Sequence, residues 1–228
     1  MSIQPWHIQN NDCPAYVLAG GRSSRFGSNK ALVRISTFGA ETTLLQSLLD
    51  SLRKQGHVTH VVADNSARFA ALGIICLEDR TNNQGPLAGL ETALQHRLEH
   101  SSAGGWLLLV SCDQLLWQSS WFLSLAQTIE KDTKVVCFQD LDSKELRPLP
   151  ALFHTDCLPE VSSALSTSSR SLRQICQSSH CRSFSISQTD GPGYWCFNTQ
   201  PELAQLQSVL NQITAVEQQN SDRNIPEA

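Results

Sequence analysis

The sequence has no apolar run that approaches the roughly 20 residues needed for a membrane-spanning helix. Residues 1–11 contain neither the basic segment nor the apolar stretch typical of a secretory signal. Positive charge is also scarce: 17 lysine and arginine residues stand against 21 aspartate and glutamate residues, and the formal net charge is −4. A chain with this charge repels nucleic acid and anionic lipid. We therefore expect a soluble cytoplasmic protein that binds neither nucleic acid nor membranes.

Paired cysteine motifs are missing as well, although the chain contains eight cysteines. No Cys-x-x-Cys pair occurs, and the neighbouring Cys176 and Cys181 have no matching second pair, so we predict no zinc site. Cys76, Cys112 and Cys137 lie in apolar runs, where cysteine behaves as a small buried hydrophobic residue. The cysteines therefore indicate buried free thiols rather than a disulfide framework.

The length and composition predict a single domain. The chain has 228 residues, of which 40% are hydrophobic, and this is enough for one substantial core. The sequence contains no internal repeat and no second-domain boundary. We expect one domain over 1–228, with flexible tails at 1–13 and 217–228, because the last segment is strongly polar.

Short apolar runs alternate with amphipathic stretches, which is typical of a mostly parallel sheet with crossover helices. The predicted strands are 16–18, 58–63, 73–77, 106–110, 134–138 and 151–154, and the predicted helices are 42–55, 86–100, 121–130 and 200–216. Apolar side chains fall on one face of the first two helices: Leu44, Leu45, Leu48, Leu49 and Leu52 on one, and Leu87, Leu90, Leu94 and Leu98 on the other. The serine-rich stretch 162–171 is predicted to be a loop or a helix boundary. The pattern predicts a three-layer α/β/α sandwich that is Rossmann-like in its first half.

A glycine-rich, basic segment follows the first predicted strand. It reads Leu-Ala-Gly-Gly-Arg-Ser-Ser-Arg-Phe-Gly-Ser-Asn-Lys from residue 18 to residue 30. Gly20 and Gly21 allow the backbone to approach a ligand and to point successive N–H groups at an anion. Arg22, Arg25 and Lys30 add local positive charge, and an arginine can hold phosphate oxygens bidentately. The segment lacks both the Gly-Lys-Ser/Thr of a Walker loop and the Gly-x-Gly-x-x-Gly of a dinucleotide fingerprint. It therefore predicts a different kind of phosphate-binding loop.

A second segment combines a carboxylate with small residues at the start of a helix. Asp79 ends a predicted strand, and Gly-Pro-Leu-Ala-Gly follows from Gly85 to Gly89. Small residues here allow close approach of a base or a sugar, and a helix N-terminus favours an anion. Asp79 has the chemistry to accept hydrogen bonds from a base or a ribose. Taken alone, the segment could equally be an ordinary helix cap.

A third carboxylate, Asp113, stands where the predicted strand 106–110 runs out. The carboxyl ends of strands line the ligand crevice in an open α/β sheet. A carboxylate that faces a polyphosphate there is a natural Mg²⁺ ligand, because Mg²⁺ is usually bound by one or two carboxylates together with phosphates and water. The alternative is that Asp113 caps the next helix.

Together, the three segments resemble the molybdenum cofactor guanylyltransferase family, within the wider MobA-like nucleotidyltransferases that open with Leu-Ala-Gly-Gly. The match runs in order from Tyr16 to about Leu203. The segment 147–153 resembles the family's central Pro-x-x-Ala-Leu strand, and 170–173 resembles its Arg-Ser-Leu helix start. Gly-Pro-Leu-Ala-Gly is the more specific motif, because related cytidylyltransferases usually lack it and open with a Thr-Ala-Ala-Gly type of loop.

The resemblance implies a nucleotidyltransferase fold, GTP as the donor, Mg²⁺ as the metal and molybdenum-molybdopterin as the acceptor. Molybdoenzyme apoenzymes or their chaperones would be further partners. The residues implied to bind the nucleotide are Leu18, Ala19, Gly20, Gly21, Lys30, Asp79, Gly85 and Asp113. The implied catalytic residues are Arg25, Lys30 and Asp113, of which Asp113 would hold the metal. Asn198 is placed on the acceptor side.

The sequence departs from the family pattern at three places. The family usually has Cys-Asp-x-Pro, whereas Asp113 is followed here by Gln114, Leu115 and Leu116. The family's Asn-x-Asn-Thr-Pro-x-x-Leu aligns with 196–203, where Cys196 replaces the first asparagine. The asparagine expected after the second strand is also missing, and Asp-Asn occupies 64–65. Two alternatives therefore stay open: a related transferase with CTP as donor or another phosphorylated acceptor, and a non-catalytic paralogue that binds GTP or the cofactor.

Overall fold

The computed structural model describes residues 8–20, 29–37, 40–79, 85–101, 103–167, 171–178 and 180–223. The strands are β1 (Ala15–Leu18), β2 (Arg34–Thr37), β3 (Ala40–Thr43), β4 (Thr59–Ala63), β5 (Cys76–Glu78), β6 (Trp106–Ser111), β7 (Val135–Asp140), β8 (Leu146–His154) and β9 (Cys181–Ile186). The α-helices are α1 (Leu44–Lys54), α2 (Pro86–Glu99), α3 (Ser119–Gln127), α4 (Leu158–Ser166), α5 (Leu172–Cys176) and α6 (Gln200–Arg223). Short 3₁₀ helices are η1 (Asn10–Asp12), η2 (Lys30–Leu32), η3 (Ser66–Leu72), η4 (Thr155–Cys157) and η5 (Pro192–Trp195).

A seven-stranded sheet with the order β5-β4-β1-β6-β8-β7-β9 organises the fold. All of its strands run in one direction except β8, which pairs antiparallel with both β6 and β7. In the register, Val17 of β1 lies between Val61 of β4 and Val110 of β6. The carboxyl ends of β4, β1 and β6 therefore meet at one edge of the sheet. The strands β2 and β3 form a separate antiparallel hairpin.

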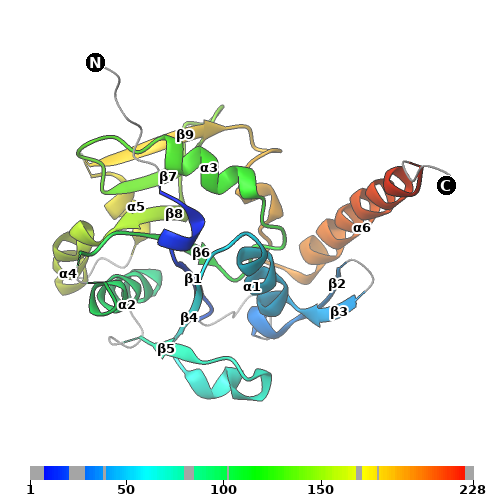
Figure 1. Ribbon diagram of the computed structural model, residues 1–228, viewed down its shortest axis with the longest axis horizontal. Helices are drawn as coiled ribbons and strands as arrows, with labels where there is room; N and C mark the ends of the chain where they lie inside the picture. The colour runs from blue at the N-terminus through cyan, green and yellow to red at the C-terminus, as the bar shows by residue number, and fades with distance from the viewer. Residues whose placement is uncertain are drawn as a thin grey trace.

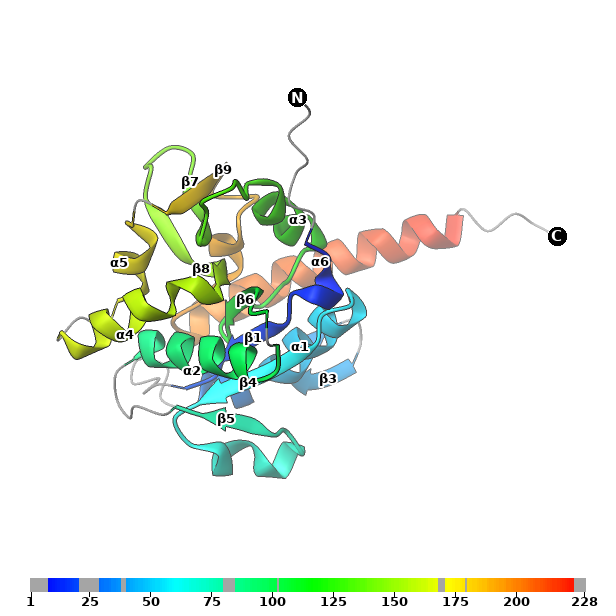
Figure 2. The ribbon, with the colours of Figure 1, turned by 60° about the vertical axis from the view of Figure 1, so that its left-hand side comes forward.

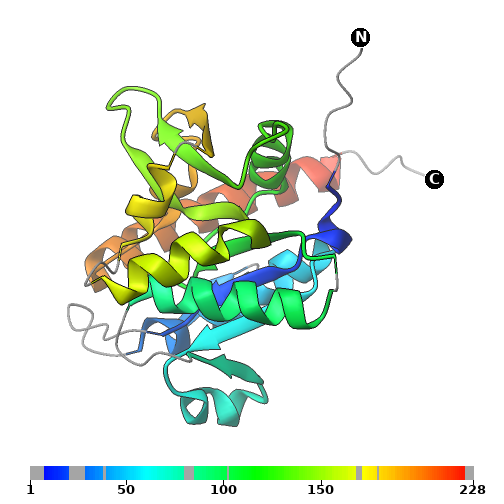
Figure 3. The same ribbon diagram turned by 90° about the vertical axis from the view of Figure 1, so that its left-hand side faces the viewer.

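Helices cover both faces of the sheet, so the predicted α/β/α sandwich is confirmed. One buried cluster joins the sheet to α1, α3 and α6, and the other joins it to α2, α4 and α5. Leu108 and Val110 of β6 contribute to the first cluster, while Leu107 and Leu109 contribute to the second, as strand alternation requires. Figure 1 shows α1 and α2 on opposite sides of β1 and β4, and Figure 3 shows α2 and α4 side by side over one face.

Helix α1 shows how local sequence sets an element. The side chain of Thr43 caps it by accepting a hydrogen bond from the backbone N–H of Gln46 at 3.2 Å. Its predicted apolar leucines are all buried. After the helix, Gly56 adopts φ 91°, a left-handed conformation that glycine takes without steric cost. The predicted helix is therefore confirmed.

Several boundaries differ from the prediction. Leu98 is 39% exposed, because burial along α2 ends at Leu94 and the last turn faces solvent. The stretch 162–171, predicted to be a loop or a helix boundary, contains the end of α4 at Ser166, and Val161 and Ala164 of this helix are buried against the sheet. The hairpin β2–β3 and the edge strand β9 were not predicted, because they are short, polar and stabilised by pairing rather than by apolar runs.

The ends of the chain are also more structured than predicted. Cys13 is fully buried, and the side chain of Asn10 donates a hydrogen bond to the backbone carbonyl of Gln55 at 2.8 Å, so the expected flexible segment 1–13 is packed in its second half. Helix α6 continues to Arg223, past the predicted end at residue 216, and projects from the body in Figure 2. In the part of the chain that the structure describes, no helix combines the length and apolar character that crossing a bilayer requires.

Candidate active site

The site is built at the edge of the sheet where four parallel strands end. Gly20 follows β1, Asp64 follows β4, Asp79 follows β5 and Asp113 follows β6. Because β5, β4, β1 and β6 are consecutive neighbours in the sheet, these residues line one edge. This is the edge at which open α/β sheets bind ligands. The topology therefore brings the start of the glycine segment, Asp79 and Asp113 to one edge of the sheet, as predicted.

Lys30 is anchored at this edge by several contacts. It stands in η2, and its Nζ lies 3.6 Å from Oδ2 of Asp113. The same ammonium group donates hydrogen bonds to the backbone carbonyl of Phe197 at 2.7 Å and to Oδ1 of Asn198 at 3.3 Å. The exposed fractions of the Lys30 and Asp113 side chains are 13% and 25%. The fold therefore holds a cation beside a carboxylate, and brings together Lys30, Asp113 and Asn198 from distant parts of the sequence.

Asp113 does not cap the following helix. Helix α3 begins at Ser119, and its N-cap residue is Gln118. The Asp113 carboxylate is directed at Lys30 instead. The capping alternative for Asp113 is therefore wrong, because an irregular segment separates this residue from the helix.

Asp79 presents an unsatisfied acceptor to the site. Its backbone N–H donates to the carbonyl of Ala63 at 3.1 Å, and this bond places the residue beside the end of β4. Oδ1 of Asp79 is buried and has no hydrogen-bond partner among the described residues. Burial, together with the negative charge of Asp64, raises the pKa of Asp79 to about 6. A buried acceptor without a donor is costly, and a ligand donor would relieve the cost.

The two glycines of the Gly-Pro-Leu-Ala-Gly segment serve different purposes. Gly85 precedes α2 with φ 68° and ψ −159°, a conformation that favours glycine, and Pro86 then occupies the first turn. A Cβ on Gly89 would lie 2.6 Å from Cδ2 of Leu18. The side chain of Leu18 lies beside Gly89, and Oδ1 of Asp79 would lie 3.6 Å from the same Cβ. Gly89 admits close packing of α2 on β1.

The first residues of the glycine segment are tied into the sheet. The carbonyl of Leu18 accepts a hydrogen bond from the N–H of Cys112 at 3.0 Å, and the N–H of Ala19 donates to the carbonyl of Val62 at 2.8 Å. A Cβ on Gly20 would lie 3.1 Å from the backbone nitrogen of Asp64, so the chain passes close to the end of β4. Three predicted phosphate-binding residues lie outside the described residues: Gly21, Arg22 and Arg25.

Comparison with known proteins agrees with this geometry. The family model of the MobA-like NTP transferase domain matches residues 15–183. A protein of Deinococcus radiodurans named "probable molybdenum cofactor guanylyltransferase" is 32% identical over 160 residues, which cover 70% of this chain and 76% of the relative. The chain belongs to the MobA-like NTP transferase family. It is a nucleotidyltransferase of the α/β type.

Solved structures of this family and beyond share the fold. Molybdopterin-guanine dinucleotide biosynthesis protein A from Archaeoglobus fulgidus matches with a TM-score of 0.67 at 15% identity, over 87% of this chain and 99% of that one. The 4-diphosphocytidyl-2C-methyl-D-erythritol synthase of Anaerococcus prevotii matches with a TM-score of 0.62 at 12% identity, over 87% and 96%. At these identities the likeness shows the fold alone.

Two of the three departures from the MobA-like pattern meet at one contact, which sequence reasoning did not reveal. The Cys196 thiol donates to Oε1 of Gln114 at 3.2 Å, and the two residues form an isolated antiparallel bridge. Gln114 is 1% exposed, and its Nε2 donates to the carbonyls of Leu116 and Pro192 at 2.9 and 3.0 Å. These bonds fasten the segment before Asn198 to the segment after Asp113.

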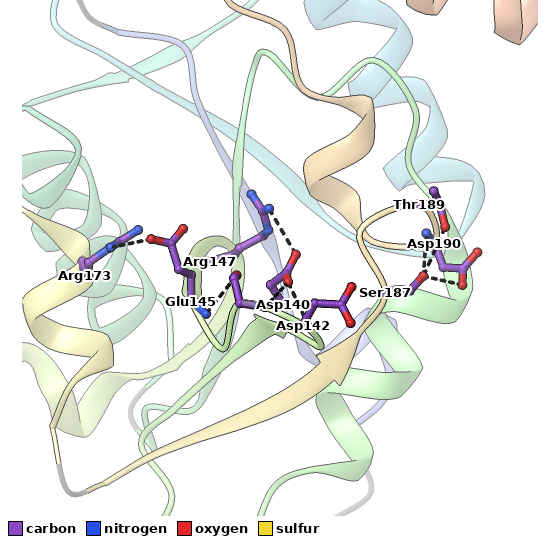
Figure 4. A network of polar contacts seen from close by, with 9 residues as sticks. Asp140, Asp142, Glu145, Arg147, Arg173, Ser187, Thr189 and Asp190 are labelled. Atoms are coloured by element: carbon purple, nitrogen blue, oxygen red, sulfur yellow. Dashed lines mark hydrogen bonds and ion pairs between the residues drawn. The ribbon is translucent and has the colours of Figure 1, made fainter.

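Arg147 contacts η5, the short helix before Cys196, and belongs to the polar network in Figure 4. Its Nη2 lies 3.5 Å from Oδ2 of Asp140, and Oδ1 of Asp140 accepts hydrogen bonds from the N–H groups of Asp142 and Ser143 at 3.1 and 2.9 Å. A Cβ on Gly193 would lie 2.8 Å from Nη1 of Arg147, so the guanidinium lies against the backbone of η5. The sequence showed Arg147 only as part of a strand motif. The available signal for a polar contact was a basic residue near the start of a strand.

Proposed function

We propose that this chain transfers GMP from GTP to molybdenum-molybdopterin, forming the guanine dinucleotide form of the cofactor and pyrophosphate. Family membership supports nucleotidyl transfer, and the name of the Deinococcus radiodurans relative supports this donor and acceptor. The observation that carries the proposal is the position of Lys30, which is fixed beside Asp113 and Asn198 at the ligand-binding edge of the sheet. A fixed cation there is what a triphosphate needs from an acidic protein.

The reaction requires no covalent enzyme intermediate. The terminal phosphate of the acceptor attacks the α-phosphorus of GTP in line, one P–O bond forms, and the P–O bond to the leaving pyrophosphate breaks. Since the acceptor is already an anion, catalysis rests on positioning and charge neutralisation. Lys30 supplies a preorganised positive charge, and we propose Arg25 as a second one. We propose that Asn198, which is exposed and hydrogen-bonded to Lys30, contacts the acceptor.

The residues at the edge fit a magnesium ion that travels with the nucleotide. The Asp113 carboxylate is 25% exposed and belongs to the strand-end loop of β6. Within the described ranges no group of three or more His, Cys, Asp or Glu residues could hold a metal ion. A single carboxylate nevertheless suits Mg²⁺, which takes its other ligands from phosphates and water. When bound, the ion neutralises charge on the triphosphate.

Asp79 is proposed to recognise the nucleoside. Guanine carries an N1–H and an exocyclic amine as adjacent donors. The buried Oδ1 of Asp79 has no donor among the described residues, so it is an acceptor without a partner at the site edge. Cytosine and adenine do not offer the same adjacent donor pair. A site whose buried acceptor is left unpaired by the wrong base discriminates strongly.

The remaining expectations follow from this activity. The product would pass to molybdoenzyme apoenzymes or their chaperones in the cytoplasm, and residues 1–228 would act as one nucleotidyltransferase domain. Gly21 and Gly85 are proposed to help bind the nucleotide through their backbones.

Pyrophosphate release separates an enzyme from a binding protein. The purified chain is incubated with Mg²⁺ and each of the four nucleoside triphosphates, with and without molybdenum-molybdopterin. We expect pyrophosphate only with GTP and acceptor together, and a product with the mass of the guanine dinucleotide. GTP binding without turnover would support the non-catalytic paralogue, and release with CTP would support a related cytidylyltransferase.

A further inference from the structure

Three cysteines from separate elements meet beneath the edge strand of the sheet. Cys137 belongs to β7, Cys176 ends α5 and Cys181 begins β9. The Sγ atoms of Cys137 and Cys181 lie 3.8 Å apart. The thiol of Cys176 interacts electrostatically with both. This cluster of Cys137, Cys176 and Cys181 lies away from the strand ends that carry the active site.

The three thiols differ in exposure. Cys137 is fully buried and Cys176 is 2% exposed, whereas Cys181 is half-buried at the edge of the sheet. A small oxidant can therefore reach Cys181 first. Because Cys137 and Cys176 are buried next to Cys181, an oxidised sulfur at Cys181 would have a reduced thiol in contact with it.

The surroundings of Cys181 favour its thiolate. Hydrogen bonds from Cys137 and then Cys176 lower the pKa of Cys181, burial raises it, and the charge of Arg182 lowers it again. In the neutral form its thiol donates to the backbone carbonyl of Arg182 at 3.4 Å. The other half-buried thiol outside the active site, Cys76, has the opposite shift, because burial and the charge of Glu78 raise its pKa. The thiolate is the nucleophile in thiol chemistry, so the two half-buried cysteines should differ in reactivity.

We propose that Cys181 and Cys137 form a dithiol site that a hydroperoxide oxidises to a disulfide. The Cys181 thiolate attacks one oxygen of the peroxide, the O–O bond breaks, and a sulfenic acid and hydroxide (or alkoxide) form. The sulfur of Cys137 then attacks the sulfenic sulfur, an S–S bond forms, and water leaves with the proton of Cys137. The peroxide gains the two electrons that the two sulfurs lose.

The two sulfurs are already in contact, and their strands place them diagonally. The parallel register places Cys181 opposite Val135, so Cys137 lies two residues further along the same face of the neighbouring strand. Closing the sulfurs from 3.8 Å to about 2.05 Å requires side-chain rotation and adjustment of the edge strand. The bond would tie β9 covalently to β7. This inference does not depend on the proposed transferase function.

The first test measures thiolate reactivity in the unmodified, fully reduced chain. Iodoacetamide is added at pH 6.5, and alkylation of each cysteine is followed by peptide mass spectrometry. Cys181 is expected to react at least about tenfold faster than Cys76, because its surroundings favour the thiolate and those of Cys76 disfavour it. Equal or slower reaction of Cys181 would overturn the proposal.

The second test identifies the disulfide. After treatment with hydrogen peroxide, non-reducing peptide mapping should show a Cys137–Cys181 link in the wild type and in the control Cys76→Ser. Cys137→Ser should give no such link. Cys137→Ser combined with Cys176→Ser, which leaves no neighbouring thiol, should leave a sulfenic acid at Cys181 that dimedone traps. A wild-type protein that remains unlinked, or that links other cysteines at the same rate, would contradict the inference even if a variant failed to fold.

Discussion

The thiol of Cys196 donates a hydrogen bond to Oε1 of Gln114 at 3.2 Å, and this contact joins two segments in which the chain departs from its family. Beside it, the N–H of Leu115 donates to the carbonyl of Trp195 at 2.9 Å. The family usually has proline at position 115, and proline has no N–H to donate. The two departures therefore occur where the same pair of segments is joined, and Lys30 still reaches both Asp113 and Asn198.

Replacing Leu115 by the family's proline should destabilise this chain. Leu115→Pro removes the donor to Trp195 and leaves a carbonyl unpaired, so we expect a loss of about 1–3 kcal/mol in the free energy of unfolding. Urea denaturation measures it. The matched control Leu115→Met keeps the N–H and the volume and should cost less than about 1.5 kcal/mol. Equal stability of the two variants would show that the backbone bond contributes nothing.

Lys30→Ala should remove transition-state stabilisation. Loss of one preorganised donor typically raises the activation free energy by about 2–4 kcal/mol. We expect kcat/KM to fall by the corresponding factor while the protein remains folded. Steady-state kinetics and thermal denaturation check the two parts. Lys54→Ala, at the exposed end of α1, is the control and should keep full activity. A folded Lys30→Ala enzyme with turnover within a few-fold of the wild type would rule out a catalytic role.

Asp113→Asn tests the proposed metal ligand. Asparagine keeps the shape of the side chain but removes the charge, so activity should fall at least about a hundredfold and the Mg²⁺ titration should shift to higher concentration. The far-UV circular dichroism should stay unchanged. The exposed Asp132→Asn is the matched control and should change neither property. An Asp113→Asn enzyme with the wild-type magnesium dependence would mean that another group binds the ion.

Parts of this arrangement were predictable because they follow from local pattern. The alternation of apolar runs and amphipathic helices predicted the layers, and the strand-end rule predicted that Asp113 faces the crevice. The contact between Gln114 and Cys196 was not predictable, because it joins residues 82 apart in the chain. The packing of Leu18 beside Gly89 was not predictable for a similar reason, because it joins residues that only the fold brings together.

Asp79 should make apo-protein stability depend on pH. Its pKa is raised from 3.8 to about 6 in the folded state, so the fold favours the protonated form. The folded state then binds more protons than the unfolded state between these values, and stability is lost as pH rises from about 4 to about 6. Asp79→Asn should lack this loss and be more stable than the wild type at pH 7.5. We expect about 1 kcal/mol, less than the full shift because the carboxyl is only partly buried.

GTP binding should show the complementary behaviour. If the ionised Asp79 carboxylate accepts hydrogen bonds from guanine, GTP affinity should be full above about pH 6 and fall as pH decreases through that value. Calorimetric titrations of the wild type and Asp79→Asn at pH 5.5 and 7.5 measure this. The variant should bind weakly at both values. A wild-type GTP affinity that is independent of pH would show that the ionised carboxylate of Asp79 does not bind the nucleotide.

The most direct test of the account is base choice in the complete reaction. The specificity constants kcat/KM are measured for GTP, ATP and CTP with molybdenum-molybdopterin as acceptor and Mg²⁺ present. An acceptor at Asp79 that only guanine satisfies predicts a preference for GTP of at least about a hundredfold, or roughly 2.7 kcal/mol. A preference for CTP, or equal use of ATP and GTP, would contradict the guanylyltransferase proposal.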